Sequence, residues 1–252
     1  MNKISVGIIG CGFIGGALKN WLEKNNKENI SLFISDPPKG YNDDLSTVNI
    51  IFIGIHIPTE EDGSQDLSLL KQILNNTPNV PIFIRTTILP GTTEALSNEF
   101  NKDIYFLPEF LTERTAYQDF CTQPMIFSGE VELLKKIFPG KKYIEMSSLE
   151  AEITKYVHNV FGALKVTYFN GIYDICSKLN LNYQNIQKGV LLSGYINSTH
   201  THVPGPDGKL GYGGKCFPKD VNALTNLFKE YPICNILKEL KPLNTHFRGE
   251  DK

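Results

Sequence analysis

The stretch ISVGIIGCGFIGG, from Ile4 to Gly16, decides the fold of this chain. Its first six residues form a short, largely β-branched run that is typical of a buried strand, and a helical pattern follows from about residue 15 to residue 23. The motif G-x-G-x-x-G joins the two. Its first glycine makes a tight turn, its second lets a pyrophosphate approach the backbone, and its third lets helix and strand pack closely. The segment therefore predicts a strand, a turn and a helix whose N-terminus binds phosphate. We expect the dinucleotide-binding residues here to be Gly10, Gly12, Phe13, Ile14 and Gly15.

Asp36 stands at the end of the second predicted strand, 21 residues after Gly15. A carboxylate at that position binds the ribose hydroxyls of a dinucleotide and repels a 2′-phosphate. The sequence therefore predicts NAD rather than NADP as the cofactor. A glycine-rich turn with an incidental acidic residue is the alternative, and the combination of strand, loop, helix and acid argues against it.

Continuous apolar runs return at residues 30–34, 50–55, 81–84 and 104–106. Strands buried on both faces read as continuous rather than alternating runs, so these predict a parallel sheet covered by helices. From Glu152 to Leu179, apolar residues recur at helical spacing and predict one long helix with a broad apolar stripe. A short helical segment is predicted to follow near Tyr183 to Leu192. We expect an α/β protein with a Rossmann-type doubly wound parallel sheet as an NAD-binding domain over residues 1–150. A helical domain with one long central helix is expected over 151–252, with homodimerisation through residues 152–179.

The composition excludes several classes of protein. The 252 residues include 25 Lys and Arg against 27 Asp and Glu, which gives no basic field for nucleic acid. The apolar runs fall short of the roughly 20 residues that a membrane helix needs. Five cysteines without a C-x-x-C pair argue against a disulfide framework and a zinc site. We expect a cytoplasmic protein with no metal and no nucleic-acid or membrane partner, and a polar tail from Lys241 that frays.

The segment GYGGKCFPKD, from Gly211 to Asp220, carries a candidate nucleophile. It places Cys216 in a glycine-rich loop immediately before a helix that Pro218 can start. The helix N-terminus and the flanking lysines favour the nucleophilic thiolate, and Asp220 can orient a lysine or a water. The other four cysteines read as small buried side chains.

Two pairs of polar residues at helical spacing add further candidates. Lys155 and Asn159 are four apart in the predicted long helix and share one face, where they can hold a substrate oxygen and stabilise an oxyanion as hydride leaves. Glu109 and Glu113 are also four apart, and either can act as a general base or bind substrate. Taken alone, each pair is equally typical of an exposed helix face.

Together these motifs resemble the UDP-glucose/GDP-mannose dehydrogenase family, the nucleotide-sugar 6-dehydrogenases. The last segment is the most specific, because G-Y-G-G-x-C-F-P-K-D is close to the nucleophile signature of that family. The segments that carry the resemblance are 10–15, 61–64 with 66–68, 85–87 with 90–93, 108–111, 155–159 and 211–220.

The resemblance implies a four-electron oxidation of a sugar C6 alcohol to a carboxylate with two NAD molecules in succession. Cys216 would attack the aldehyde, and the thiohemiacetal would be oxidised to a thioester that water hydrolyses. The roles implied are oxyanion stabilisation by Lys155 and Asn159, assistance to water or lysine by Asp220, a hydrolytic base in Glu109, and positioning of water and nicotinamide by Thr87. Glu113 and Lys219 resemble cofactor contacts, and the implied substrate contacts are Glu109, Lys155, Asn159 and Gly213.

The chain also departs from the family pattern. Family members carry a further nucleotide-binding domain that grips the nucleotide half of the substrate, whereas only 32 residues follow Asp220 here. We expect a short form without that domain, and a truncated chain or a partner chain that completes the site remains open. Tyr195 stands where the family has an arginine that reaches the substrate of a neighbouring subunit, and Arg114 stands where glycine is usual. We therefore expect a UDP-glucose-like substrate, without predicting which nucleotide sugar it is.

Two other functions remain open from the sequence. A β-hydroxyacid or 6-phosphogluconate type dehydrogenase shares the dinucleotide loop and a lysine-asparagine helix, which residues 155–159 also resemble, but needs no cysteine. A non-catalytic NAD-binding subunit would bind the cofactor with an inert Cys216. The three functions are distinguished by the number of NADH formed per substrate and by whether turnover depends on Cys216.

Overall fold

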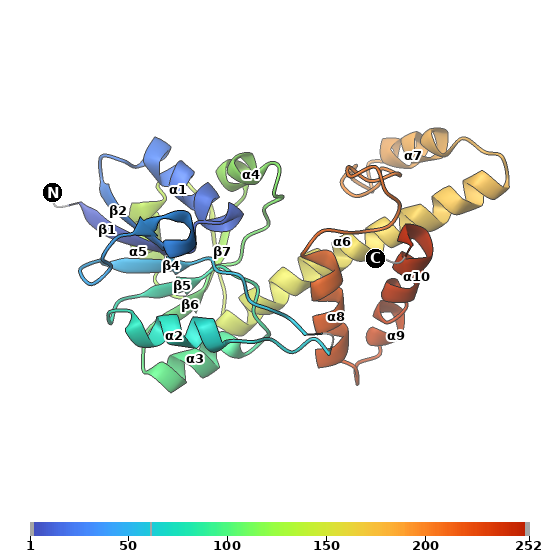
Figure 1. The fold of residues 1–252 in the computed structure, drawn as a ribbon. Helices are drawn as coiled ribbons and strands as arrows, with labels where there is room; N and C mark the ends of the chain where they lie inside the picture. Colours follow the sequence, from blue (N-terminus) through green and yellow to red (C-terminus); the bar gives the residue numbers. More distant parts are fainter. Residues whose placement is uncertain (1–2, 61, 250–252) are drawn as a thin grey trace. The chain divides into compact units, whose positions relative to one another are not determined.

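The computed structural model describes residues 3–60 and 62–249, so Glu61 of the 61–64 motif lies outside the described part (Figure 1). The chain divides into two compact units. The first unit contains the residues up to Pro58 together with Gln65–Lys155, and the second contains Thr59–Ser64 together with the residues from Tyr156 onward. The main division therefore falls inside a helix.

A six-stranded sheet forms the centre of the first unit, with strand order β3-β2-β1-β4-β5-β6. All neighbouring strands are parallel except β3, which pairs antiparallel with β2. The order reverses at β1, which is the arrangement of a doubly wound sheet, so the predicted fold class is confirmed. The strands are β1 (Ile4–Ile9), β2 (Ile30–Asp36), β3 (Tyr41–Asn42), β4 (Ile50–Ile53), β5 (Ile82–Ile84) and β6 (Ile104–Phe106).

Helices cover both faces of this sheet (Figure 1). Ile50 and Phe52 of β4 pack into the hydrophobic core beneath α1, α4 and α5, whereas Ile51 and Ile53 pack into the core beneath α2 and α3. This two-sided burial explains why the strand reads as a continuous apolar run. The elements are α1 (Phe13–Asn25), the 3₁₀ turn η1 (Pro37–Lys39), α2 (Ser68–Asn76), α3 (Thr92–Phe100), α4 (Ala116–Thr122) and α5 (Val131–Ile137), with a separate parallel pair β7 (Met125–Phe127) and β8 (Tyr143–Glu145).

The second unit is helical. Its elements are the greater part of α6 (Ser148–Lys178), then α7 (Tyr183–Leu192), α8 (Phe217–Leu227), α9 (Cys234–Leu237) and α10 (Leu240–Arg248). The predicted long helix and the helix at 183–192 are confirmed, but the expectation that the chain frays from Lys241 is wrong. Leu237 and Leu240 are buried in one core with Val160 and Ala163 of α6, which fixes the start of α10.

Gly63 packs on α8 within this second unit. Gly63 has a φ of +84°, and a Cβ there would lie 2.8 Å from the Cα of Ala223. Glycine is therefore required both by backbone conformation and by close contact. No helix in the described part of the chain is long and apolar enough to span a membrane.

Glu152 fixes the beginning of α6 to α3 inside the first unit. Its fully buried carboxylate accepts hydrogen bonds from Gly91 N (2.6 Å), Thr93 N (2.8 Å) and Thr93 Oγ1 (2.5 Å). Burial raises the pKa of Glu152, and these hydrogen bonds oppose that shift. The motif at residues 90–93 thus supplies the N-terminus of α3 as a binding site for this carboxylate.

Replacing Glu152 with alanine tests this anchor. Because the variant leaves buried N–H groups without an acceptor, we expect Glu152→Ala to lower the free energy of unfolding by about 2–4 kcal/mol in denaturant titrations. Glu150→Ala is the matched control, since Glu150 is exposed and bonds only to Ser147 in the first turn. We expect a loss of about 1 kcal/mol or less from the control. Equal losses in the two variants would contradict an anchoring role.

Candidate active site

The glycine loop lies at the carboxyl end of β1 and leads into α1. Gly10 has a φ of +83°, and a Cβ on Gly15 would lie 2.0 Å from the Gly10 carbonyl oxygen. These two glycines therefore serve the turn and the close helix–strand contact. A Cβ on Gly12 would meet no atom within 4 Å, so a ligand can approach the backbone at this point. The loop has the shape that a pyrophosphate requires.

Asp36 lies directly beside this loop. Its Oδ2 accepts a hydrogen bond from Cys11 N at 2.7 Å, and Lys39 Nζ donates to Cys11 O at 2.7 Å. An ionised carboxylate has about four acceptor positions, so Asp36 can also accept from ribose hydroxyls. The N–H groups of the first turn of α1, which begins at Phe13 and Ile14, have no partner within the helix and favour phosphate. These residues fit a dinucleotide such as NAD.

Glu109 and Lys155 form a buried ion pair within the first unit. Lys155 Nζ lies 3.0 Å from Glu109 Oε1, with 4% of each side chain exposed, and it also donates to the Glu109 carbonyl oxygen. Glu109 Oε2 accepts from Leu111 N at 2.7 Å, which fixes the orientation of the carboxylate. The structure thus brings the predicted base and the predicted oxyanion-binding lysine together.

A second polar group gathers at the start of α8 in the second unit. Asp220 is fully buried and accepts hydrogen bonds from Asn159 Nδ2 (2.5 Å) and Lys219 Nζ (2.5 Å). Cys216 is the N-cap of α8, and its carbonyl oxygen accepts from Asp220 N at 2.9 Å. The helix begins at Phe217, one residue before the predicted Pro218. Two predicted site residues, Lys219 and Asp220, therefore lie within about one helical turn of Cys216, and Asn159 of α6 bonds to Asp220.

The loop that carries Cys216 is held by α10. Asn244 brackets the Tyr212 peptide, accepting from its N–H at 2.7 Å and donating to its carbonyl oxygen at 2.9 Å. A Cβ on Gly211 would lie 2.4 Å from Asn244 Oδ1, and one on Gly213 would lie 2.2 Å from Arg248 Nη2. Gly211, which also has a φ of +68°, is therefore required beside Asn244, and the guanidinium of Arg248 lies over Gly213. Asn244 and Arg248 were not predicted from the sequence, although leucines at 240 and 243 and phenylalanine at 247 have helical spacing.

The remaining predicted residues lie outside these hydrogen-bonded groups. Thr87 is half-buried in the segment after β5, where its carbonyl oxygen accepts from Gln65 Nε2 at 3.2 Å. Glu113 is exposed in the turn before α4. Burial raises the pKa of the Cys11 thiol, which leaves that cysteine a poor nucleophile. Across residues 3–60 and 62–249, no cluster of three or more His, Cys, Asp or Glu side chains could hold a metal ion.

Comparisons with known proteins agree with the dehydrogenase class that this fold defines. Residues 149–246 match the family model of the UDP-glucose/GDP-mannose dehydrogenase family, central domain. The UDP-glucose 6-dehydrogenase of Rickettsia felis is 32% identical over 219 residues, which cover 79% of this chain and 48% of that protein. The chain is thus similar to members of the UDP-glucose/GDP-mannose dehydrogenase family, and it spans about half the length of the curated relatives that it matches.

Solved structures share the fold. A UDP-glucose dehydrogenase from Pyrobaculum islandicum has a TM-score of 0.78 at 21% identity and covers 97% of this chain and 68% of that chain. A 3-hydroxyisobutyrate dehydrogenase from Salmonella typhimurium has a TM-score of 0.68 at 14% identity and covers 99% and 97%, respectively. At these identities the likeness establishes the fold alone.

Replacing Asn244 with alanine tests whether α10 holds the cysteine loop. The variant leaves the Tyr212 N–H without its acceptor, so we expect at least about tenfold faster amide hydrogen exchange across residues 211–216. Thr245→Ala is the matched control, because Thr245 is exposed on the same helix and its hydroxyl bonds only within α10. The control should leave exchange in the loop unchanged. Unchanged exchange in Asn244→Ala would show that the loop is held by other contacts.

Proposed function

We propose that this chain catalyses the NAD-dependent oxidation of the C6 alcohol of a UDP-glucose-like nucleotide sugar to the carboxylate, by two hydride transfers and a thioester on Cys216. The observation that carries the proposal is the hydrogen-bonded group of Asn159, Lys219 and Asp220, in which the Asp220 N–H donates to the carbonyl oxygen of Cys216. Similarity to the UDP-glucose/GDP-mannose dehydrogenase family supports the reaction class. The substrate-binding residues proposed are Glu109, Lys155, Asn159 and Gly213.

The cofactor site is proposed at the glycine loop of an NAD-binding domain over residues 1–150, with a helical domain over 151–252. The backbone at Gly12 binds the pyrophosphate and Asp36 binds a ribose, with the first turn of α1 completing the phosphate site. NAD supplies the hydride acceptor, and the overall oxidation consumes two equivalents. Further proposed contacts with the cofactor are Thr87, Glu113 and Lys219.

Cys216 carries the covalent chemistry. Its thiolate adds to the aldehyde carbon, and the carbonyl oxygen takes up a proton to become the hydroxyl of a thiohemiacetal. The amide of Asn159, held by Asp220, donates to that oxygen while it carries negative charge. Loss of a hydride and a proton then gives the thioester, and one water hydrolyses it to the carboxylate, a proton and the free thiol.

Glu109 and Lys155 are proposed for the two remaining roles in the reaction. The ammonium of Lys155 stabilises the oxyanions, and the carboxylate of Glu109 accepts the proton of the hydrolytic water. Within the first unit each charge neutralises the other in a buried site. Removing one partner leaves the other charge buried and unpaired, which is strongly destabilising. Glu109→Gln and Lys155→Met therefore need a stability measurement beside any activity measurement.

Counting NADH per substrate tests the proposal. We expect two NADH per nucleotide sugar consumed from a panel of UDP- and GDP-sugars, and no carboxylate product from Cys216→Ser, because serine does not form the thioester. Cys121→Ser is the matched control, since Cys121 is an exposed thiol on α4, and it should retain full activity. Turnover that survives Cys216→Ser with one NADH per substrate would refute the thioester route.

A β-hydroxyacid type dehydrogenase is the second candidate. It is favoured by the fold likeness to 3-hydroxyisobutyrate dehydrogenase, which extends over 97% of that chain. The enzyme would then use Lys155 and Asn159 without a cysteine. NAD binding without turnover of either substrate class would instead indicate a non-catalytic NAD-binding subunit, or a site that a partner chain completes.

The exposed apolar face of α6 supports the expected homodimer. Its members are between 51% and 62% exposed and recur at spacings of four and seven, which places them on one helix face: Val157, Phe161, Tyr168 and Ile175. Leu179, directly after the helix, continues the same spacing. We expect Phe161→Glu to convert a dimer into a monomer in sedimentation experiments, because it places a charge in the apolar interface. Asp174→Lys is the control on another face of α6 and should leave the mass unchanged. A wild-type monomer would contradict the proposal.

A further inference from the structure

Arg85 is a buried cation without a hydrogen-bonded counter-ion. It follows the last residue of β5, and 3% of the residue is exposed. Its Nε and Nη1 atoms have no hydrogen-bond acceptor among the described residues. Burial lowers the pKa of Arg85 to about 10, so the guanidinium is still charged at neutral pH. Leaving two donors of a buried cation without acceptors is costly, which makes this arrangement unusual.

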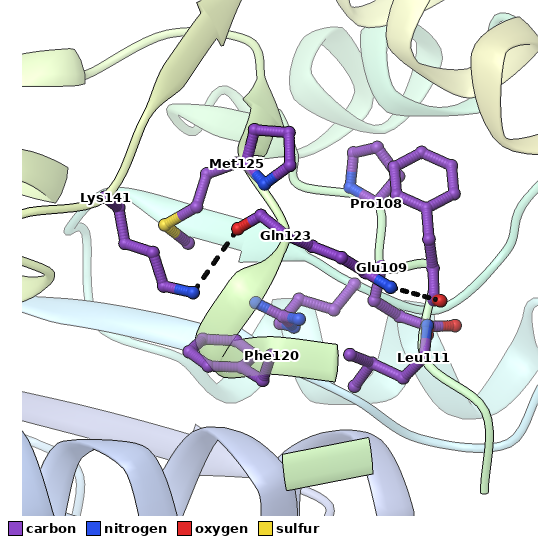
Figure 2. Close-up of a pocket in the computed structure, with 10 residues that line it drawn as sticks. Pro108, Glu109, Leu111, Phe120, Gln123, Met125 and Lys141 are labelled. Carbon is purple, nitrogen blue, oxygen red and sulfur yellow. Dashed lines mark hydrogen bonds between the residues drawn. The ribbon is translucent and has the colours of Figure 1, made fainter. Parts of the chain in front are cut away.

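A small cavity lies against this guanidinium. Its volume is about 20 Å³, and Arg85, Phe120 and Lys141 are among the residues that line it. Figure 2 labels Phe120 and Lys141 in this lining. A water-sized group needs roughly 10–15 Å³ of such space, so the cavity holds one small ion or one or two waters. Lys141 Nζ donates to Gln123 O at 3.3 Å, and Gln123 Nε2 donates to Phe110 O at 2.9 Å, which ties the walls together (Figure 2).

The charge of the lining is positive. Arg85 Cζ lies 5.2 Å from the centroid of the Phe120 ring, and Lys141 Nζ lies 4.7 Å from the same centroid. Burial lowers the pKa of Lys141, and the charge of Arg85 adds to that shift. Of the residues described along the cavity, Glu109 alone is acidic; its carboxylate pairs with Lys155, and its charge partly opposes the fall in the pKa of Arg85. Two cations therefore line a space whose single described carboxylate is already paired with a third cation, Lys155.

We propose that this cavity is a binding site for a small inorganic monoanion of the halide class, with chloride as its most abundant member. The anion accepts hydrogen bonds from the Arg85 guanidinium and offsets the repulsion between Arg85 and Lys141. Charge-assisted bonds of this kind are about twice as strong as neutral ones. Sulfate and phosphate exceed the available volume, and the nucleotide parts of a sugar nucleotide exceed it further.

The site also connects to the Glu109–Lys155 pair. The segment Pro108–Leu111 forms one wall of the cavity and carries the Glu109 side chain to Lys155. Any ligand that binds the folded cavity stabilises this segment by mass action. The proposal stands independently of Cys216 and of the oxidation proposed above, because it concerns only residues of the first unit.

Thermal unfolding at constant ionic strength tests the site. Sodium chloride is exchanged for sodium gluconate, and we expect the Tm to rise by about 2–4 °C when chloride reaches about ten times its Kd. Bromide should act like chloride, whereas sulfate should not. Arg85→Met and Lys141→Met should each reduce the chloride dependence at least tenfold in apparent affinity. Lys135→Met, at an exposed lysine of α5, should retain it.

Bromide crystallography places the ion and keeps the test independent of the variants. We expect an anomalous bromide peak within hydrogen-bonding distance of the Arg85 guanidinium in the wild-type chain. Water alone at this position, or a Tm equal in chloride and gluconate, overturns the proposal. A bromide peak without any effect of chloride on Tm indicates an adventitious ion only and also overturns it. Loss of NADH formation with an intact bromide site would count against the proposed oxidation and leave this site standing.

Discussion

The ammonium of Lys155 and the carboxylate of Glu109 are buried against each other, and the local structure of the first unit depends on that contact. Moving either charge out of water alone costs several kcal/mol, so α6 and the segment after β6 must come together for both to be stable. Glu152, one turn earlier on α6, adds a second buried carboxylate that is satisfied by the start of α3. The beginning of α6 is therefore placed by electrostatics as well as by apolar packing.

Glycine has a different physical role in each of the two loops. In the loop after β1, Gly10 and Gly15 allow the helix to approach the strand, and Gly12 leaves the backbone open to a ligand. In the cysteine loop, Gly211 is required by its φ of +68° and by the side chain of Asn244 against the backbone, and Gly213 lies under the guanidinium of Arg248. A glycine-rich segment thus indicates ligand access in one loop and side-chain packing in the other.

The sequence was sufficient to predict the elements that are defined by local pattern. The strands at 4–9 and 104–106 and the helix at 183–192 were predicted with their observed bounds, because apolar period and turn residues mark them clearly. Strands β7 and β8 are only three residues long and carry little periodic signal. The helix α10 was missed because polar residues dominate it, and its stability depends on Leu240 and on contacts with a distant loop.

The candidate site was likewise predictable where local sequence pattern defines it and not where long-range contacts do. Glu109, Lys155, Asn159 and Asp220 were identified by type and spacing, whereas their pairing and the orphaned guanidinium of Arg85 depend on long-range contacts that no local pattern reveals.

The central claim is that Cys216 carries the substrate covalently, and mass spectrometry of the trapped enzyme tests it most directly. Glu109→Gln, after its fold has been checked, is mixed with NAD and a UDP-hexose and quenched in acid within the first turnover. Because hydrolysis is slowed in this variant, the account predicts that the peptide containing Cys216 gains the mass of the uronyl group as a thioester, and that Cys216→Ser shows no such adduct. NADH formation at an undiminished rate with an unmodified Cys216 peptide would contradict the account.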